Sequence, residues 1–182
     1  MLSNWTGTIA DIHRVLIGAI IMLMSATVAS NDSNPNRDLS LGAGYGILFG
    51  GLGVNIARIE GNNYQYASLG VISAFSSDYD GEKNSDIAYG VGVGWIRTDV
   101  IFPSSEKHGL GLYLGAVDAE SRWEGEPSRR ESLKTRYGAG ATYSYFTSGL
   151  ESPGFVIGAS ILFSSGSDSD KANFLATLGY TF

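Results

Sequence analysis

The chain has 182 residues, enough for one domain beside any segment removed during export, and a net charge of −6. This acidic balance argues against a nucleic-acid-binding protein, which would carry a basic stripe. The absence of cysteine excludes disulfides, thiolate metal ligands, a cysteine nucleophile and a lipid-modified N-terminal cysteine.

The first 29 residues have the pattern of a secretory signal. An apolar run from Val15 to Met24 follows Arg14, and small residues follow the run, with Thr27 and Ala29 at the positions that a signal peptidase reads. The run is shorter than the roughly 20 residues of a membrane-spanning helix, although an N-terminal membrane anchor is the alternative. We therefore expect residues 1–29 to be a cleaved signal peptide and residues 30–38 to be a disordered segment.

From residue 39 onward, apolar residues alternate with small or polar ones in eight segments separated by turn-rich stretches. This alternation is typical of strands in a small transmembrane barrel. The expected strands cover residues 39–49, 52–59, 66–75, 87–98, 109–116, 136–145, 155–164 and 173–182.

Gly50 and Gly51 join the first two segments and suit a two-residue primed turn, which needs positive φ. Such a turn places Phe49 opposite Leu52 on the apolar face. The same register pairs Ile47 with Val54 and Tyr45 with Ile56.

The face opposite the apolar one is dominated by Gly, Ser, Thr and Ala. An eight-stranded barrel has an interior that side chains just fill, so this face is expected inside, with room for Tyr66, Tyr113 and Arg136. A soluble β-sandwich or lipid-carrying barrel, the alternatives, would present Lys and Glu on the surface. Charged residues instead lie almost wholly between the strands.

The strand order predicts two aromatic belts at the membrane interfaces. The outward loops are expected at residues 50–51, 76–86, 118–135 and 165–172, and the periplasmic links at 60–65, 99–107 and 147–154. The periplasmic belt comprises Trp95, Tyr143, Tyr145, Phe155, Tyr180 and Phe182, and the outer belt comprises Phe49, Phe75, Tyr89, Tyr137, Phe163 and Phe174.

The last segment alternates with period two and ends on Phe182. Together with the belts, it resembles the small bacterial outer-membrane β-barrels of the OmpA and OmpX kind. The resemblance implies an all-β fold, an eight-stranded antiparallel transmembrane up-and-down barrel over residues 39–182, in the outer membrane of a Gram-negative bacterium. It also implies that the barrel assembly machinery recognises Tyr180 and Phe182, and that the other partners are outer-membrane lipids and lipopolysaccharide.

No catalytic, cofactor or metal site is expected. Of two histidines, His13 lies in the signal segment, and His108 lies at the periplasmic start of the fifth strand, where we interpret it as a solvated turn residue. Outer-membrane enzymes use a histidine near the outer rim, and a serine without a base is not activated. The acidic residues Asp78, Asp80, Glu82 and Asp86 lack a full cation-loop pattern, so a solvated loop is favoured over a Ca²⁺ or Mg²⁺ site.

The loop at 118–135 is the candidate interaction site. Arg122 and Trp123 resemble the anchors of recognition surfaces, and Arg129, Arg130 and Lys134 could contact lipopolysaccharide phosphates. Its mixed charges also suit an inert, self-paired loop. We therefore predict a structural or surface-interaction protein, with an unknown surface ligand. A narrow, porin-like pore for small solutes is the alternative, and a lipid-modifying enzyme is the third hypothesis.

Overall fold

The computed structural model describes residues 39–79, 82–124, 130–164 and 171–182, with the backbone alone for 75–79, 82–84, 121–124 and 130–132. These residues belong to the second of two compact units, Asn36–Phe182; the first is Met1–Pro35. The expected signal peptide and the segment 30–38 lie outside the described residues. Within the described part, no helix is long and apolar enough to cross a bilayer.

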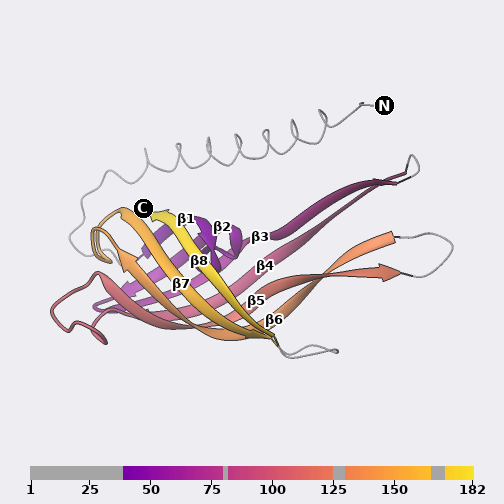
Figure 1. The fold of residues 1–182 in the computed structure, drawn as a ribbon. Coiled ribbons are helices and arrows are strands. Elements are labelled where there is room, and N and C mark those ends of the chain that lie inside the picture. Colours follow the sequence, from indigo (N-terminus) through magenta and orange to yellow (C-terminus); the bar gives the residue numbers. More distant parts are fainter. Residues whose placement is uncertain (1–38, 80–81, 125–129, 165–170) are drawn as a thin grey trace. The chain divides into compact units, whose positions relative to one another are not determined.

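Eight strands form one closed barrel in which each strand pairs antiparallel with its sequence neighbours, and β8 pairs with β1 (Figure 1). The predicted up-and-down barrel is therefore confirmed. The strands are β1 (Leu39–Gly46), β2 (Gly51–Glu60), β3 (Asn63–Tyr79), β4 (Glu82–Arg97), β5 (His108–Glu124), β6 (Arg130–Phe146), β7 (Gly154–Ser164) and β8 (Lys171–Thr181), with a 3₁₀ turn, η1 (Ile47–Phe49), between β1 and β2.

The two faces of the barrel wall follow the predicted alternation. Leu112 and Leu114 point outward and are 64% and 62% exposed, whereas Tyr66, Tyr113 and Arg136 are buried inside, as predicted. The periplasmic-belt residues Trp95 and Phe155 and the outer-belt residues Tyr89, Tyr137, Phe163 and Phe174 are exposed. Phe182 is buried instead, with its ring edge-on to Tyr180 at 5.0 Å between centroids.

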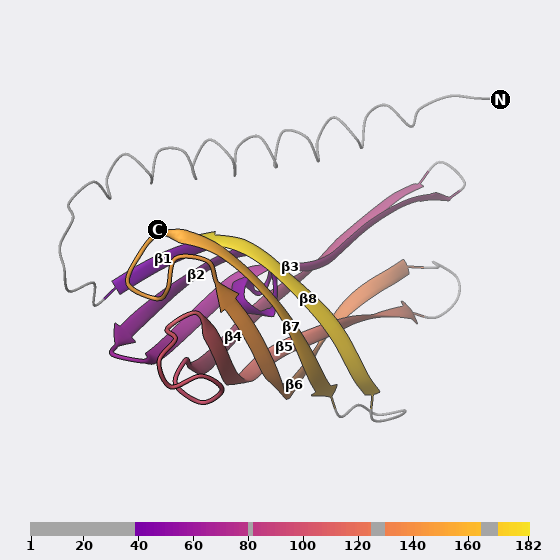
Figure 2. The ribbon, with the colours of Figure 1, turned by 60° about the vertical axis from the view of Figure 1, so that its left-hand side comes forward.

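Two of the predicted outward loops are mostly strand. β3 and β4 stay paired out to Tyr79 and Glu82, and β5 and β6 out to Glu124 and Arg130, so the predictions of loops at 76–86 and 118–135 were wrong. Both pairs continue as two-stranded ribbons beyond the rest of the wall (Figure 2). The sequence of these extensions resembles a loop because they have no apolar face. An antiparallel pair does not need an apolar face, however, since its backbone hydrogen bonds hold the two strands together.

We call the ribbons the β3–β4 arm (73–79 with 82–88) and the β5–β6 arm (118–124 with 130–136). Each begins at a register shift, between Val71 and Ser73 in β3 and between Ala116 and Asp118 in β5. Such bulges bend a ribbon and increase its twist. The arms mark one end of the barrel, the arm end; short links and loops at 61–62, 98–107 and 147–153 mark the other, the turn end.

The connection between β1 and β2 folds into the barrel. β1 stops at Gly46, which pairs with Gly51, and Tyr45 pairs with Leu52 rather than Ile56. The predicted Gly50–Gly51 hairpin and the outward positions of Ile47 and Phe49 were therefore wrong. All three side chains of η1 are buried, and Gly50, with φ of 69°, closes the turn through an N–H bond to the Ile47 carbonyl at 3.2 Å.

The ring of Phe49 lies in a recess that only glycine can form. Side chains at Gly44 and Gly179 would overlap the ring, and a Cβ at Gly42 would lie 3.0 Å from it. Gly44 is on β1 and Gly179 is its pairing partner on β8, so the ring packs against the seam that closes the barrel. The glycines of the inner face thus make room for a specific side chain.

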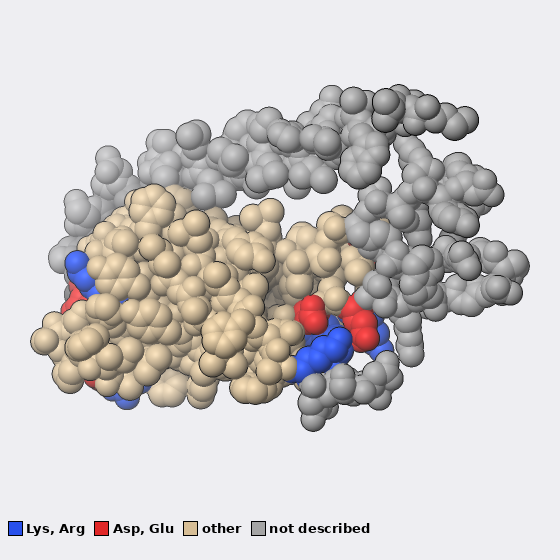
Figure 3. Space-filling view, in the orientation of Figure 1, with Lys and Arg blue, Asp and Glu red and all other residues tan. Residues whose placement is uncertain are grey.

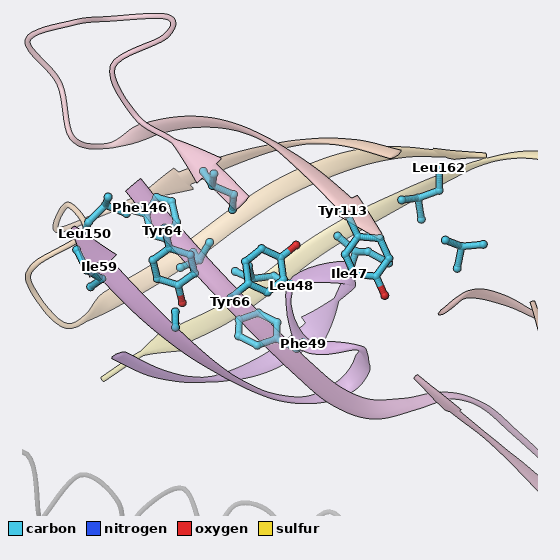
Figure 4. Close-up of a cluster of buried hydrophobic side chains, with 14 residues drawn as sticks. Ile47, Leu48, Phe49, Ile59, Tyr64, Tyr66, Tyr113, Phe146, Leu150 and Leu162 are labelled. Carbon is cyan, nitrogen blue, oxygen red and sulfur yellow. The ribbon is translucent and has the colours of Figure 1, made fainter. Parts of the chain in front are cut away.

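Large buried side chains project into the lumen toward both ends of the barrel (Figure 4). Toward the turn end, Ile59, Tyr64, Ile96, Phe146 and Val156 pack together, with the rings of Tyr64 and Phe146 5.4 Å apart. Toward the arm end, Leu48, Phe49, Tyr66, Tyr113 and Leu162 continue the same cluster. Asn55 on β2 fastens η1 to the wall, because its side-chain N–H₂ donates to the Leu48 carbonyl at 3.0 Å.

Candidate interaction site at the arm end

The two arms separate where β4 and β5 stop pairing. Their ladder runs from Arg97 and Leu110 only as far as Gly92 and Gly115. Beyond that level β6 contacts β4, since the Thr135 hydroxyl donates to the Tyr89 carbonyl at 3.3 Å. This contact lies beside the bulge in β5, where the β5–β6 arm begins.

Asp86 ties the two arms together. Its Oδ2 accepts the backbone N–H of Leu133 on β6 at 2.7 Å, and its Oδ1 accepts that of Ile87 at 2.9 Å. A carboxylate that accepts two N–H groups forms charge-assisted hydrogen bonds, which are stronger than neutral ones. The sequence suggested that Asp86 belongs to a solvated loop. In the structure it is instead a structural link between the two arms.

A charged pair lies within the β5–β6 arm, near its base. The guanidinium Nη1 of Arg136 is 3.3 Å from Glu120 Oε2, and the Arg136 side chain is almost fully buried while that of Glu120 is 40% exposed. The register places Asp118 opposite Arg136. Inside a barrel, a buried guanidinium needs such partners because desolvation of an isolated charge is costly.

Four of the five predicted contact residues lie on the β5–β6 arm. Arg122 and Trp123 lie in β5 and Arg130 in β6, where the structure describes the backbone, and Arg129 lies outside the described residues. Lys134 is exposed and stands opposite Glu120 in the register. Glu124 stands opposite Arg130 and Asp118 opposite Arg136, so an acidic residue faces a basic one at three levels of this arm.

His108 is not the solvated turn residue that we expected. It begins β5, is half-buried, and its Nδ1 lies 2.8 Å from the Tyr143 hydroxyl. The rings of Phe102 and Tyr145 each have centroids 5.0 Å from the His108 ring. His108 is thus one member of an aromatic cluster at the turn end. The side chains of 85–120 and 133–164 hold no group of His, Asp and Glu suited to a metal ion.

Two features at the arm end of the barrel were not predicted from the sequence. Leu48 is a large apolar residue at a position where the inner face otherwise has Ser40, Gly42, Gly44 and Gly46, and this break signals the inserted η1. The link from Asp86 to Leu133 joins residues 47 apart in the sequence and leaves no local signal.

Replacing Asp86 with alanine should loosen the arms without unfolding the barrel. The charge-assisted hydrogen bond to the Leu133 amide is lost together with the one to Ile87, so we expect the Leu133 amide to exchange about tenfold faster, or ~1.4 kcal/mol of local stability. Amide hydrogen exchange in lipid nanodiscs measures this. Asp118→Ala is the matched control, because it also removes a carboxylate from an arm, while Asp118 Oδ1 accepts the N–H of its own neighbour Ala119, at 2.8 Å, and not an N–H of the other arm. Equal Leu133 exchange rates in the two variants would contradict the link.

The outer surface of the barrel wall separates two charged ends with an apolar band. Figure 3 shows Lys, Arg, Asp and Glu gathered at the turn end and at the base of the arms, with none on the surface between them in that view. On β6 the band runs from Tyr137 to Tyr145, nine residues, and a tilted strand needs about 9–11 residues to cross a bilayer. The band is formed by exposed side chains that include Leu41, Val54, Leu69, Val91, Val93, Leu112, Leu114, Ile157, Ile161 and Leu178.

The comparisons with known proteins add one solved structure. The chain is similar to the outer-membrane protein Ail of Yersinia pestis, solved in a phospholipid bilayer nanodisc, with 19% identity, a TM-score of 0.36, and coverage of 79% of this chain and 98% of that one. No protein-family model and no curated protein sequence matches. A likeness of this size carries no functional conclusion, which rests instead on the surface of the chain itself.

Proposed function

We propose that this protein is an integral barrel of the bacterial outer membrane with a structural or surface-interaction role and no enzymatic activity. The observation that carries the proposal is the exposed apolar band between two charged ends. A monomeric soluble protein rarely exposes a continuous apolar surface of this extent, whereas lipid-facing residues of a membrane barrel must be apolar.

The arms carry the surface role in this proposal. The turn end faces the periplasm and the arms extend outside the cell, because outer-membrane barrels have short periplasmic turns and longer extracellular segments. Arg129, Arg130 and Lys134 would then lie near the lipopolysaccharide phosphates, which basic side chains bind through charge-assisted hydrogen bonds. Lipopolysaccharide is therefore the first partner to test.

Binding of lipopolysaccharide should depend on this basic group. For the triple variant Arg129→Ala, Arg130→Ala and Lys134→Ala in nanodiscs, we expect the affinity measured by calorimetry to fall at least about tenfold, or ~1.4 kcal/mol. The control variant Arg58→Ala with Lys107→Ala removes positive charge at the turn end and should bind normally. Unchanged binding by the triple variant would mean that the arm charges only pair with one another.

A narrow pore is the second candidate, and the large side chains inside the barrel argue against it. Phe49, Tyr66 and Tyr113 belong to the buried cluster of the lumen and are each less than 5% exposed. An eight-stranded barrel whose interior holds such side chains is a packed core and not a channel. In planar bilayers we therefore expect the protein to insert without sustained open currents. Stable unit conductance from the purified protein would establish the pore.

A further inference from the structure

The loop between β4 and β5, residues 98–107, exposes three consecutive apolar side chains. Val100, Ile101 and Phe102 are 56%, 37% and 51% exposed, although they lie beyond the end of the strand. The other described connections at the turn end, 61–62 and 147–153, have no comparable exposed apolar run. An exposed apolar cluster at the edge of a larger apolar surface marks an interaction site.

Contacts within the loop place this cluster on the outside of the barrel. The Phe102 ring packs edge-on against His108, with 5.0 Å between centroids. His108 begins the row of outward residues that continues with Leu110 and Leu112, both of which are exposed on the apolar band. The N–H of Ser105 donates to the Phe102 carbonyl at 2.9 Å, which turns the chain back toward β5. Phe102 therefore connects the apolar cluster of the loop with the band.

The polar groups of the loop are compatible with the edge of a bilayer. Arg97 Nε donates to Asp99 Oδ1 at 3.0 Å, and this hydrogen bond holds the pKa of the Asp99 carboxyl below its usual range, so the loop's first acidic residue is paired with a cation. Glu106 and Lys107 follow on the exposed side beyond Pro103. His108 and Tyr143, hydrogen-bonded at 2.8 Å, have the amphipathic rings that favour the headgroup level.

We propose that Val100, Ile101 and Phe102 insert into the periplasmic leaflet of the outer membrane, so that the β4–β5 loop binds phospholipid beside the barrel. This inference rests on the proposed function, since it requires the apolar band to lie in a bilayer. The occupant is a phospholipid leaflet rather than a soluble protein because the cluster adjoins the lipid-facing row at His108 and Leu110. Apolar side chains that enter an interface in this way bind in proportion to their buried area.

The absence of cysteine allows a direct test with single nitroxide labels. The variants Phe102→Cys, Ser104→Cys and Leu112→Cys are each labelled and placed in nanodiscs of phosphatidylethanolamine and phosphatidylglycerol. Collisions with oxygen report the lipid phase, and collisions with a nickel chelate report water. We expect oxygen to dominate at positions 102 and 112 and the nickel chelate to dominate at position 104.

The three positions separate the possible failures. If the nickel chelate dominates at 102 while oxygen dominates at 112, the loop points into the periplasm and the inference is wrong, although the membrane barrel stands. If the nickel chelate dominates at 112 as well, both proposals fail. Val100→Cys provides a second label that leaves the Phe102–His108 contact in place, and it must report lipid as Phe102→Cys does.

Discussion

Replacing Phe49 with alanine will destabilise the barrel by about 3–5 kcal/mol, the usual cost of removing a large buried aromatic side chain. Phe49 is fully buried, and its ring fills the recess formed by Gly42, Gly44 and Gly179. The cavity would open at the seam between β1 and β8, which holds only four residue pairs. Urea unfolding in lipid vesicles, followed by tryptophan fluorescence, measures the change in free energy.

A double-mutant cycle with Gly179 tests whether the recess is specific. A Cβ at Gly179 would overlap the Phe49 ring and also approach the Ala43 carbonyl at 2.7 Å, so Gly179→Ala alone should be destabilising. In the Phe49→Ala background the ring is absent, and the same substitution should cost at least about 1 kcal/mol less, since contacting residues are not additive. Additive effects would show that the ring does not occupy the recess.

Replacing Leu112 with arginine has the second large expected effect. Leu112 lies midway along the apolar band and is 64% exposed. If the band faces lipid, arginine at this depth costs about 2–4 kcal/mol. If it faced water, an exposed substitution of this kind would change stability by less than about 0.5 kcal/mol.

The same vesicle unfolding measurement distinguishes these outcomes. Glu106→Arg, in the polar part of the β4–β5 loop, is the matched control and should leave the unfolding free energy within about 0.5 kcal/mol of the parent. If Leu112→Arg were as harmless as this control, the band would not be a lipid-facing surface.

The alternation of side chains made the barrel wall predictable. Residues such as Leu112 and Tyr113 are sorted between two faces, the exposed apolar band outside and the lumen inside, and this sorting leaves a period of two in the sequence. The strands of the arms were not predicted because this sorting is absent there. Asp118–Glu124 and Arg130–Thr135 lie beyond the apolar band, so their strands carry no apolar period and resemble loops.

The inserted turn and the inter-arm link could not be read from local pattern alone. Ile47 and Phe49 keep the outward parity of β1, and only Leu48 interrupts the small inner residues. The chain enters the lumen because the Phe49 ring fits a recess between glycines. One of these is Gly179, which lies 130 residues after Phe49 in the sequence. The hydrogen bond between Asp86 and the Leu133 amide likewise joins two strands, β4 and β6, at positions 47 residues apart.

The most direct test of a closed membrane-spanning barrel is gel migration of the outer-membrane fraction, with and without boiling in SDS. A closed barrel whose backbone groups are all paired within the wall resists the detergent until heated. We predict that the protein fractionates with the outer membrane and migrates differently before and after boiling. Recovery in the soluble periplasmic fraction, with identical migration under both conditions, would contradict the membrane barrel.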